Sequence, residues 1–253
     1  MSQLMYAAED TLVTADQLAA IPTRNPLGRF HQPVGYGTFL DLVKHRLDRA
    51  GIEVVHEEYV TSNEGGRFFG CMELSVGGLE IDGMTITLGL RGSHDQSVPR
   101  ALCLGNRVLV CSNLCFNGDI ATVSTKQTTN VMQRLPGLVD QAVDRIPGLA
   151  QREQSRMHAY QEHVFSSPRH GDAALVECHR QGALTAAQLG RAINEWDQPS
   201  YEEHAQFGDS AWKLINAVTE AQKPTGATVN MNHVAERTAI AGRFIDQVVG
   251  LTF

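Results

Sequence analysis

The sequence lacks any hydrophobic run that approaches the ~20 residues needed to span a bilayer. Residues 1–5 also lack the charged flank and the long apolar region of a secretory signal peptide. The hydrophobic fraction of 42% and the charged fraction of 19% are ordinary for a globular protein. We therefore expect a cytoplasmic protein that makes no contact with a membrane.

The patterns of a metal or disulfide centre are also missing. The five cysteines are scattered, and no two of them have the C-x-x-C spacing of a zinc or redox site. Cys111 and Cys115 lie four residues apart, and a zinc site that also uses His94 stays an alternative, but a closed zinc site needs four ligands. We expect reduced, buried thiols and no bound metal.

Catalytic motifs are absent as well. There is no Gly-Lys-Ser/Thr of a phosphate-binding loop, and no G-x-G-x-x-G follows a strand-like run. Ser93, His94 and Asp95 are adjacent in the chain, whereas the members of a Ser-His-Asp triad converge from separate segments. The sequence therefore predicts no cofactor and no enzymatic activity, and an enzyme of an unrecognised type is a lesser alternative.

Positive charge is scarce, since 28 acidic residues face 21 Lys and Arg and the net charge is −7. This balance argues against a generic nucleic-acid binder, which usually carries a basic patch. Within residues 84–118, however, Arg91, Arg100 and Arg107 face only Asp95. Two interpretations stay open, a basic strip that binds a phosphate chain and three ordinary structural arginines.

The most informative segment is residues 84–118. Two apolar runs, residues 84–90 and 101–111, have strand length and are bounded by Gly, Pro and Asn, and the polar cluster at residues 91–97 joins them. We expect two neighbouring strands in one buried sheet. Buried polar side chains must find partners, so this cluster either binds a ligand or braces the fold through Ser93 and Asp95.

Hydrophobic periodicity predicts the other elements. Residues 1–35, punctuated by Pro and Gly, are expected to form an extended arm or an irregular lead-in, and residues 37–51 a helix with Gly51 at its C-terminus. Strands at 53–60 and 67–76, joined by a hairpin turn at 62–66, complete an antiparallel meander. The arm and the open sheet edges together predict a homo-oligomer.

The second half of the sequence is helical in pattern. We expect the stretch 130–165 to break into three helices at Pro136 and Pro147, because each Pro-Gly pair kinks a helix or starts a new one. Further helices are predicted at 170–181, 185–196, 201–222 and 231–249, with Thr185 and Asp209 or Ser210 as N-caps.

The predicted fold class is α+β, an antiparallel β-meander half followed by a helical half. We expect a single domain over residues 1–253. It divides into an N-terminal arm at 1–35, a helix and β-meander at 36–120, and a helical part at 121–253.

The pattern L-G-L-R-x-S-H-D-x-S…A-L-x-L-G-x-R-V-x-V-C-x-N-L-x-F, in residues 88–116, resembles a family of phage- and plasmid-encoded proteins of unknown function. Flanking segments that are similar to the family include Arg67-Phe68-Phe69-Gly70 and Leu135-Pro136-Gly137-Leu138. The resemblance spans roughly residues 20–225. It implies a remote relation to the ring-forming single-strand annealing recombinases, whose coarse βββα core has the same order of elements.

The sequence therefore leads to two expected functions, a main one and an alternative. The first is a phage-encoded protein that binds and anneals single-stranded DNA in recombination or replication, as a homo-oligomer and without nucleotide hydrolysis. The alternative is a phage or plasmid accessory protein that binds a host protein and catalyses nothing. For the first, the predicted phosphate-contacting residues are Arg91, His94, Arg100, Arg107, Asn113 and Lys126, and the candidates for base stacking are Phe68, Phe69 and Phe116.

Overall fold

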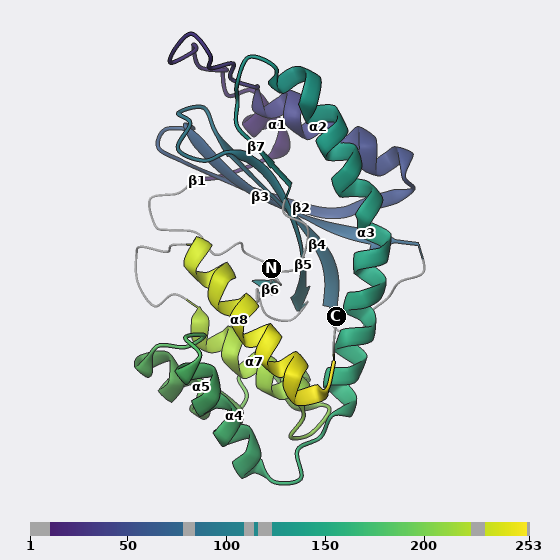
Figure 1. The fold of residues 1–253 in the computed structure, drawn as a ribbon, viewed down its shortest axis with the longest axis vertical. Helices are drawn as coiled ribbons and strands as arrows, with labels where there is room; N and C mark the ends of the chain where they lie inside the picture. The colour runs from purple at the N-terminus through teal and green to yellow at the C-terminus, as the bar shows by residue number, and fades with distance from the viewer. Residues whose placement is uncertain (1–10, 78–83, 109–113, 116–122, 224–230, 252–253) are drawn as a thin grey trace.

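The computed structural model describes residues 11–77, 84–108, 114–115, 123–223 and 231–251. A twisted sheet occupies one half of the molecule and a group of helices the other, and the long helix α3 (Val131–Glu162) runs along both (Figure 1). The predicted α+β class, an antiparallel meander followed by a helical half, is confirmed.

The strands form one antiparallel sheet with neighbours in the order β1-β2-β3-β4-β5-β6, and β7 also pairs with β5. In chain order they are β1 (Thr11–Val13), β2 (Ile52–Ser62), β3 (Arg67–Val76), β4 (Met84–Ser93), β5 (Arg100–Val108), β6 (Leu114–Cys115) and β7 (Val123–Thr125). The β2–β3 turn places Asn63, Glu64 and Gly65 at positive φ, a conformation that Asn and Gly tolerate well.

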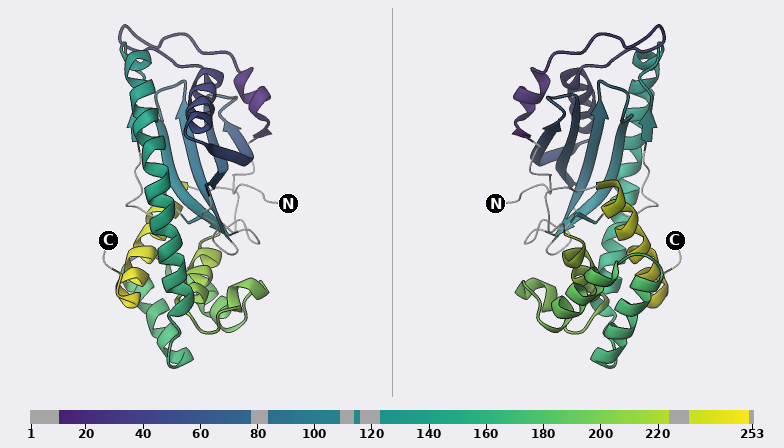
Figure 2. Two further views of the ribbon diagram at one scale, coloured as in Figure 1. Left: turned by 90° about the vertical axis from the view of Figure 1, so that its right-hand side faces the viewer. Right: turned by 90° about the vertical axis from the view of Figure 1, so that its left-hand side faces the viewer.

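Helix α2 (Tyr36–Arg49) packs an apolar stripe against the sheet. Phe39, Val43 and Leu47 recur at helical spacing and are at most 1% exposed. Gly51 follows the helix with φ of 69°, which confirms its predicted place at the helix C-terminus. Two side views show α2 and α3 on the same face of the sheet (Figure 2).

The three helices predicted at residues 130–165 are a single helix, so this prediction was wrong. Pro136 and Pro147 each remove one backbone hydrogen bond, but both lie inside α3. Their spacing of eleven residues is about three turns, so both lie on the same side of the helix. Both prolines are exposed, so this side faces solvent. The buried side, which includes Leu135 and Val143, packs continuously and holds the helix together across both prolines.

After α3, the helices follow the predicted pattern with one exception. Its helices are α4 (Pro168–Arg180), α5 (Ala186–Asp197), α6 (Glu202–Ala205), α7 (Ala211–Gln222) and α8 (Met231–Val249). Thr185 caps α5 in a capping box with Gln188, and Ser210 caps α7, as expected. The helix predicted at 201–222 is divided, because Gly208 takes a φ of 66° between α6 and α7.

The described part of the N-terminal segment contains two short elements followed by an irregular stretch at residues 21–35. Residues 1–10 lie outside the described residues, but β1 pairs with β2 and is followed by α1 (Ala15–Ala19). Thr14 and Gln17 form a capping box that starts this short helix, and Leu18 is fully buried. Val34 is 2% exposed, whereas residues 22–30 are exposed, so the segment is anchored to the core on both sides of an exposed stretch.

The core is continuous from the sheet into the helical half, where Trp196 and Trp212 are each 1% exposed. Gly171 of α4 lies directly under Trp196, and a Cβ atom there would stand 2.1 Å from the indole ring. None of the helices within the described ranges is both long and apolar enough to cross a membrane.

Candidate functional site

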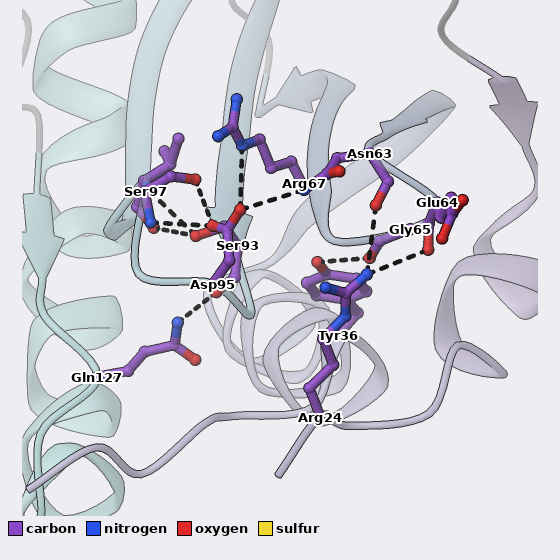
Figure 3. A network of polar contacts seen from close by, with 11 residues as sticks. Arg24, Tyr36, Asn63, Glu64, Gly65, Arg67, Ser93, Asp95, Ser97 and Gln127 are labelled. Carbon is purple, nitrogen blue, oxygen red and sulfur yellow. Dashed lines mark hydrogen bonds and ion pairs between the residues drawn. The ribbon is translucent and has the colours of Figure 1, made fainter. Parts of the chain in front are cut away.

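The β4–β5 connection, at the centre of the most informative segment, is a short loop closed by its own side chains. The hydroxyl of Ser93 accepts a hydrogen bond from the Val98 amide and donates one to the Val98 carbonyl, both at 3.0 Å. Asp95 Oδ1 accepts from the backbone N–H of Ser97 at 2.9 Å and from the Ser97 hydroxyl. Figure 3 shows these contacts beside the β2–β3 hairpin.

Asp95 also ties the loop to the β2–β3 hairpin. Its Oδ2 accepts from Asn63 Nδ2 at 3.3 Å and from Arg67 Nε at 3.4 Å. Burial by itself would raise the pKa of Asp95, but the hydrogen bonds from Ser97 and Ser93 and the charge of Arg67 hold it well below its usual range. These contacts brace the loop, which is the structural role predicted for Ser93 and Asp95.

His94 and Arg100, two of the predicted phosphate contacts, lie in the protein interior and are 0% and 1% exposed. The His94 ring stacks on Tyr36 with centroids 4.0 Å apart and donates from Nε2 to the Val34 carbonyl at 3.2 Å. Arg100 Nη2 donates to the same carbonyl. Neither side chain reaches the surface, so neither contacts a phosphate chain in this conformation.

Aromatic rings surround the buried Arg100 guanidinium. Its carbon stands 4.6 Å from the Tyr36 ring centroid, 5.4 Å from that of Phe68 and 5.7 Å from that of Phe39. No ion pair joins Arg100 to a carboxylate among the described residues, and its Nε and Nη1 have no hydrogen-bond partner there. Burial lowers the pKa of Arg100 to about 10.

Gly92 explains part of the sequence motif around Arg91. A Cβ atom at Gly92 would stand 2.3 Å from Nη1 and 2.6 Å from Cδ of Arg100. Only glycine leaves room for the guanidinium beside β4. The R-G-S-H-D pattern is therefore accounted for by packing and loop closure.

The predicted basic strip of three arginines does not form. Arg91 pairs with Ala101, and Arg100 is the next residue of β5, so Arg91 and Arg100 lie on opposite faces of the sheet. Arg107 pairs with Thr85, six residues along β4 from Arg91, which is about 20 Å at the usual rise per residue. The pleat of the sheet separates Arg100 from Arg91, and the length of the strands separates Arg107 from Arg91, although the three arginines are close together in the sequence.

The remaining predicted contacts have mixed outcomes. Asn113 and Phe116 lie outside the described residues. Phe68 is 4% exposed and belongs to the core, and Phe69 is half-buried opposite Arg91. Lys126 is exposed and lies at the edge of a surface hollow.

This hollow, here called the basic hollow, lies where the β4–β5 loop, the residues after β7 and the N-terminal segment meet. Its volume is about 420 Å³. It is lined by Gly28, Arg29, Phe30, His31, Gln96, Val98, Pro99, Lys126, Gln127 and Thr128. The lining contains two exposed cations, Arg29 and Lys126, and no carboxylate.

The N-terminal side of the basic hollow was missed by the sequence prediction. Phe30 is 67% exposed, and the guanidinium carbon of Arg29 stands 5.3 Å from its ring centroid. A third cation, Arg134 of α3, donates to the Thr128 hydroxyl at 2.8 Å. An isolated Arg-Phe dipeptide in a segment punctuated by Pro and Gly carries no periodic signal, so sequence patterns do not single it out.

Backbone contacts fix the two walls of the basic hollow to each other. His31 and Thr128 form an antiparallel bridge, and the Gln32 amide donates to the Gln127 carbonyl at 3.0 Å. The Gln127 side chain accepts from the Val34 amide at 2.8 Å and donates to the Ser93 carbonyl. The two walls of the hollow are therefore joined through the backbone and the Gln127 side chain, which also reaches the loop that carries the buried His94.

Two other hollows have the opposite charge character. The one beside the start of β2 is lined by three carboxylates and one lysine, and the one at the end of α5 by two carboxylates and one arginine, so carboxylates outnumber Lys and Arg in both. In a protein of net charge −7, the basic hollow stands out as a place that attracts an anion. Among the described residues, no group of three or more His, Cys, Asp or Glu side chains is arranged to hold a metal ion.

No family model, no curated protein and no solved structure matches this chain. The resemblance to the phage- and plasmid-encoded family therefore stays a prediction.

Proposed function

We propose that this protein is a phage-encoded single-stranded DNA-binding protein that anneals strands in recombination or replication, without nucleotide hydrolysis. The observation that carries the proposal is the basic hollow, where Arg29 and Lys126 flank an exposed Phe30 and no carboxylate enters the lining. Cations that contact the phosphate chain and an aromatic ring that stacks on a base are the combination that single-strand binders use.

The remaining parts of the proposal concern assembly and location. A hollow with three neighbouring cations, Arg29, Lys126 and Arg134, covers only a short stretch of a strand. Annealing of longer strands then needs several copies side by side, so we include a homo-oligomer in the proposal. We place the protein in the cytoplasm of the host cell.

Binding of a fluorescent oligo(dT) at several salt concentrations tests this proposal. Each phosphate contact on a single strand contributes about 0.7 to the log–log salt slope, so Arg29→Ala/Lys126→Ala should reduce the slope by about 1.4 and weaken binding at low salt. Arg145→Ala/Arg152→Ala removes two exposed cations elsewhere on α3 and serves as the charge-matched control. The proposal fails if the wild type does not bind at low salt, or if both double variants lose the same affinity.

A separate variant tests the aromatic contact. Phe30→Ala should weaken binding by roughly 1–3 kcal/mol, the usual contribution of one stacked base, and should leave the salt slope unchanged. Because Phe30 is 67% exposed, its removal should not lower the melting temperature. Equal affinities of Phe30→Ala and wild type would remove Phe30 from the interface.

A non-catalytic accessory protein that binds a host protein is the second candidate. Phe30, which lines the basic hollow, and the nearby Leu27 are 67% and 63% exposed, and such exposed apolar side chains would also suit a protein partner. The ratio of absorbance at 260 and 280 nm after purification separates the two candidates. Copurified nucleic acid supports the first, and a clean protein that binds no oligonucleotide supports the second.

A further inference from the structure

We propose that the basic hollow holds one phosphate group and that the Nε2–H group of His31 donates a hydrogen bond to it. The inference rests on the proposed function, because it assigns a phosphate subsite within the same surface. His31 is 7% exposed and lines the hollow together with Arg29 and Lys126.

The tautomer of His31 follows from its neighbour. The Leu27 backbone N–H stands 3.0 Å from Nδ1, and a backbone N–H only donates, so Nδ1 accepts and carries no proton. Burial lowers the pKa of His31, which keeps the ring neutral at pH 7 with its proton on Nε2. The ring therefore offers one N–H donor and adds no charge.

That donor has no acceptor within the described part of the chain. His31 Nε2 is buried and makes no hydrogen bond there. A buried donor without a partner is unfavourable, so an incoming acceptor oxygen gains a hydrogen bond that the free protein lacks. Since Nε2 has no contact with solvent, a side chain of the exposed rim must change its rotamer as the oxygen enters, and such changes take picoseconds to nanoseconds.

The surroundings select a phosphate over other acceptors. Arg29 and Lys126 supply positive charge, and the absence of carboxylates from the lining removes repulsion of an anion. The volume of about 420 Å³ falls within the roughly 300–1,000 Å³ of small-ligand sites, so it has room for a nucleotide unit. Phe30 next to His31 gives the attached base an exposed ring to stack on.

Two conservative substitutions separate the two ring nitrogens. His31→Asn keeps an acceptor oxygen near Nδ1 for the Leu27 amide and removes the Nε2 donor. His31→Gln keeps a donor near Nε2 and removes the Nδ1 acceptor. We expect His31→Asn to weaken oligo(dT) binding about tenfold with an unchanged salt slope, and His31→Gln to stay within about threefold of the wild type.

The two variants also have distinct failures. If His31→Asn binds oligo(dT) as tightly as the wild type while Arg29→Ala/Lys126→Ala binds weakly, the subsite is wrong and the proposed function stands. If His31→Gln loses as much affinity as His31→Asn, the Nε2 donor is not the group that matters, and the subsite is again overturned.

A measurement on the wild type does not depend on how well the variants fold. In protein with ¹⁵N-labelled histidine rings, dT oligonucleotides should shift the Nε2 resonance of His31. A larger shift with a 5′-phosphorylated strand than with a 5′-hydroxyl strand identifies a terminal phosphate, and equal shifts identify an internal phosphodiester. A His31 resonance that stays in place at saturating oligonucleotide overturns the subsite. If no oligonucleotide binds but inorganic phosphate shifts the resonance, the proposed function fails and the phosphate site remains.

Discussion

In the helical half, Arg156 of α3 makes two contacts of 2.7 Å with the carboxylate of Asp246 in α8. In the sheet half, the guanidinium of Arg100 in β5 lies among aromatic rings and donates to one carbonyl, with no carboxylate partner in the described part of the chain. Arg156 Nη1 also lies 3.3 Å from Glu153, and its Nε lies 3.1 Å from the Tyr160 hydroxyl. Both arginines are at least 95% buried, so the difference lies in their partners.

The partners set the charge of each site. Burial by itself lowers the pKa of a buried arginine, and the pKa of Arg100 falls to about 10. At Arg156, the interactions with Tyr160, Glu153 and Asp246 outweigh burial and raise the pKa above its usual value. The helical half thus contains a compensated charge that joins α8 to α3. The sheet half keeps an uncompensated positive charge one residue from Pro99, at the end of the sheet that carries the basic hollow.

The largest loss of stability should come from removing Asp246, the carboxylate that compensates the buried charge of Arg156. Asp246→Ala leaves the Arg156 guanidinium buried with only Glu153 and Tyr160, and the loss of one partner of a buried ion pair costs about 3–5 kcal/mol. Chemical denaturation measures the free energy of unfolding. Asp209→Ala, which removes a partner of the partly exposed Lys213, is the control and should cost less than about 1 kcal/mol. Equal losses in both variants would contradict the comparison.

The next largest loss of stability should come from crowding Arg100 within the aromatic rings that surround it. Gly92→Ala places a Cβ atom 2.3 Å from Nη1, and because the rings on the other side block retreat, overpacking should cost about 1–3 kcal/mol. Gly77→Ala, where a Cβ atom meets nothing within 4 Å, is the control. A wild-type melting temperature for Gly92→Ala would mean that the guanidinium is not confined.

The loop that closes over this end of the sheet depends on Asp95. Asp95→Ala removes the acceptor for Ser97, Asn63 and Arg67, and should destabilise the fold at the lower end of about 1–3 kcal/mol because the loop is partly exposed. Thermal unfolding followed by circular dichroism provides the test. An unchanged melting temperature would shift Asp95 from a bracing role to a binding role.

Acid should weaken the sheet half through His94. Burial, followed by the charge of Arg100, lowers the pKa of His94 to about 4, while the unfolded chain has a value near 6.5. Between these values the unfolded state binds more protons, so the stabilisation is complete above pH 6.5 and is lost as the pH falls towards 4. The wild-type melting temperature should therefore drop over this range. His94→Gln keeps a donor for Val34 without the titration and should show a smaller drop; an identical drop would exclude His94 as the cause.

The smallest change in the free energy of unfolding should follow from removing the uncompensated charge of Arg100 itself. Arg100→Met replaces a buried cation with an apolar side chain of similar length, and such replacements are often neutral, so we expect a change below about 1 kcal/mol. His94 still donates to the Val34 carbonyl in this variant. A loss of several kcal/mol in denaturant unfolding would mean that the three rings compensate the charge as fully as Asp246 does at Arg156.

Local patterns predicted most of the elements. The β3 strand has the bounds expected from its apolar residues, Gly51 ends α2 and Thr185 starts α5, because each depends on the backbone preferences of neighbouring residues. The break expected at Pro136 was wrong because continuous packing of α3 outweighs the loss of a single hydrogen bond. Local propensity is a weak guide wherever tertiary packing opposes it.

The candidate site was predicted only in part. Lys126 was expected to be a contact and lies at the basic hollow, but Arg100 was expected at the surface and is buried. Apolar runs reveal which segments are strands, but the face of the sheet on which each arginine lies depends on the register of strand pairing. A shift of one residue in that register moves every side chain of the strand to the other face. Phe30 and His31 carry no periodic signal, so they were missed.

By itself, the sequence determined the α+β class, the four long strands of the meander, the helices α2, α4, α5 and α8, and the polar loop between β4 and β5. These features follow from hydrophobic periodicity, turn residues and helix caps, all of which act within a few residues. Only the tertiary structure decided that Arg100 lies in the core and that Arg29, Phe30 and His31 meet Lys126. The bridge between His31 and Thr128 joins segments almost a hundred residues apart, and such a contact depends on the packing of the whole chain.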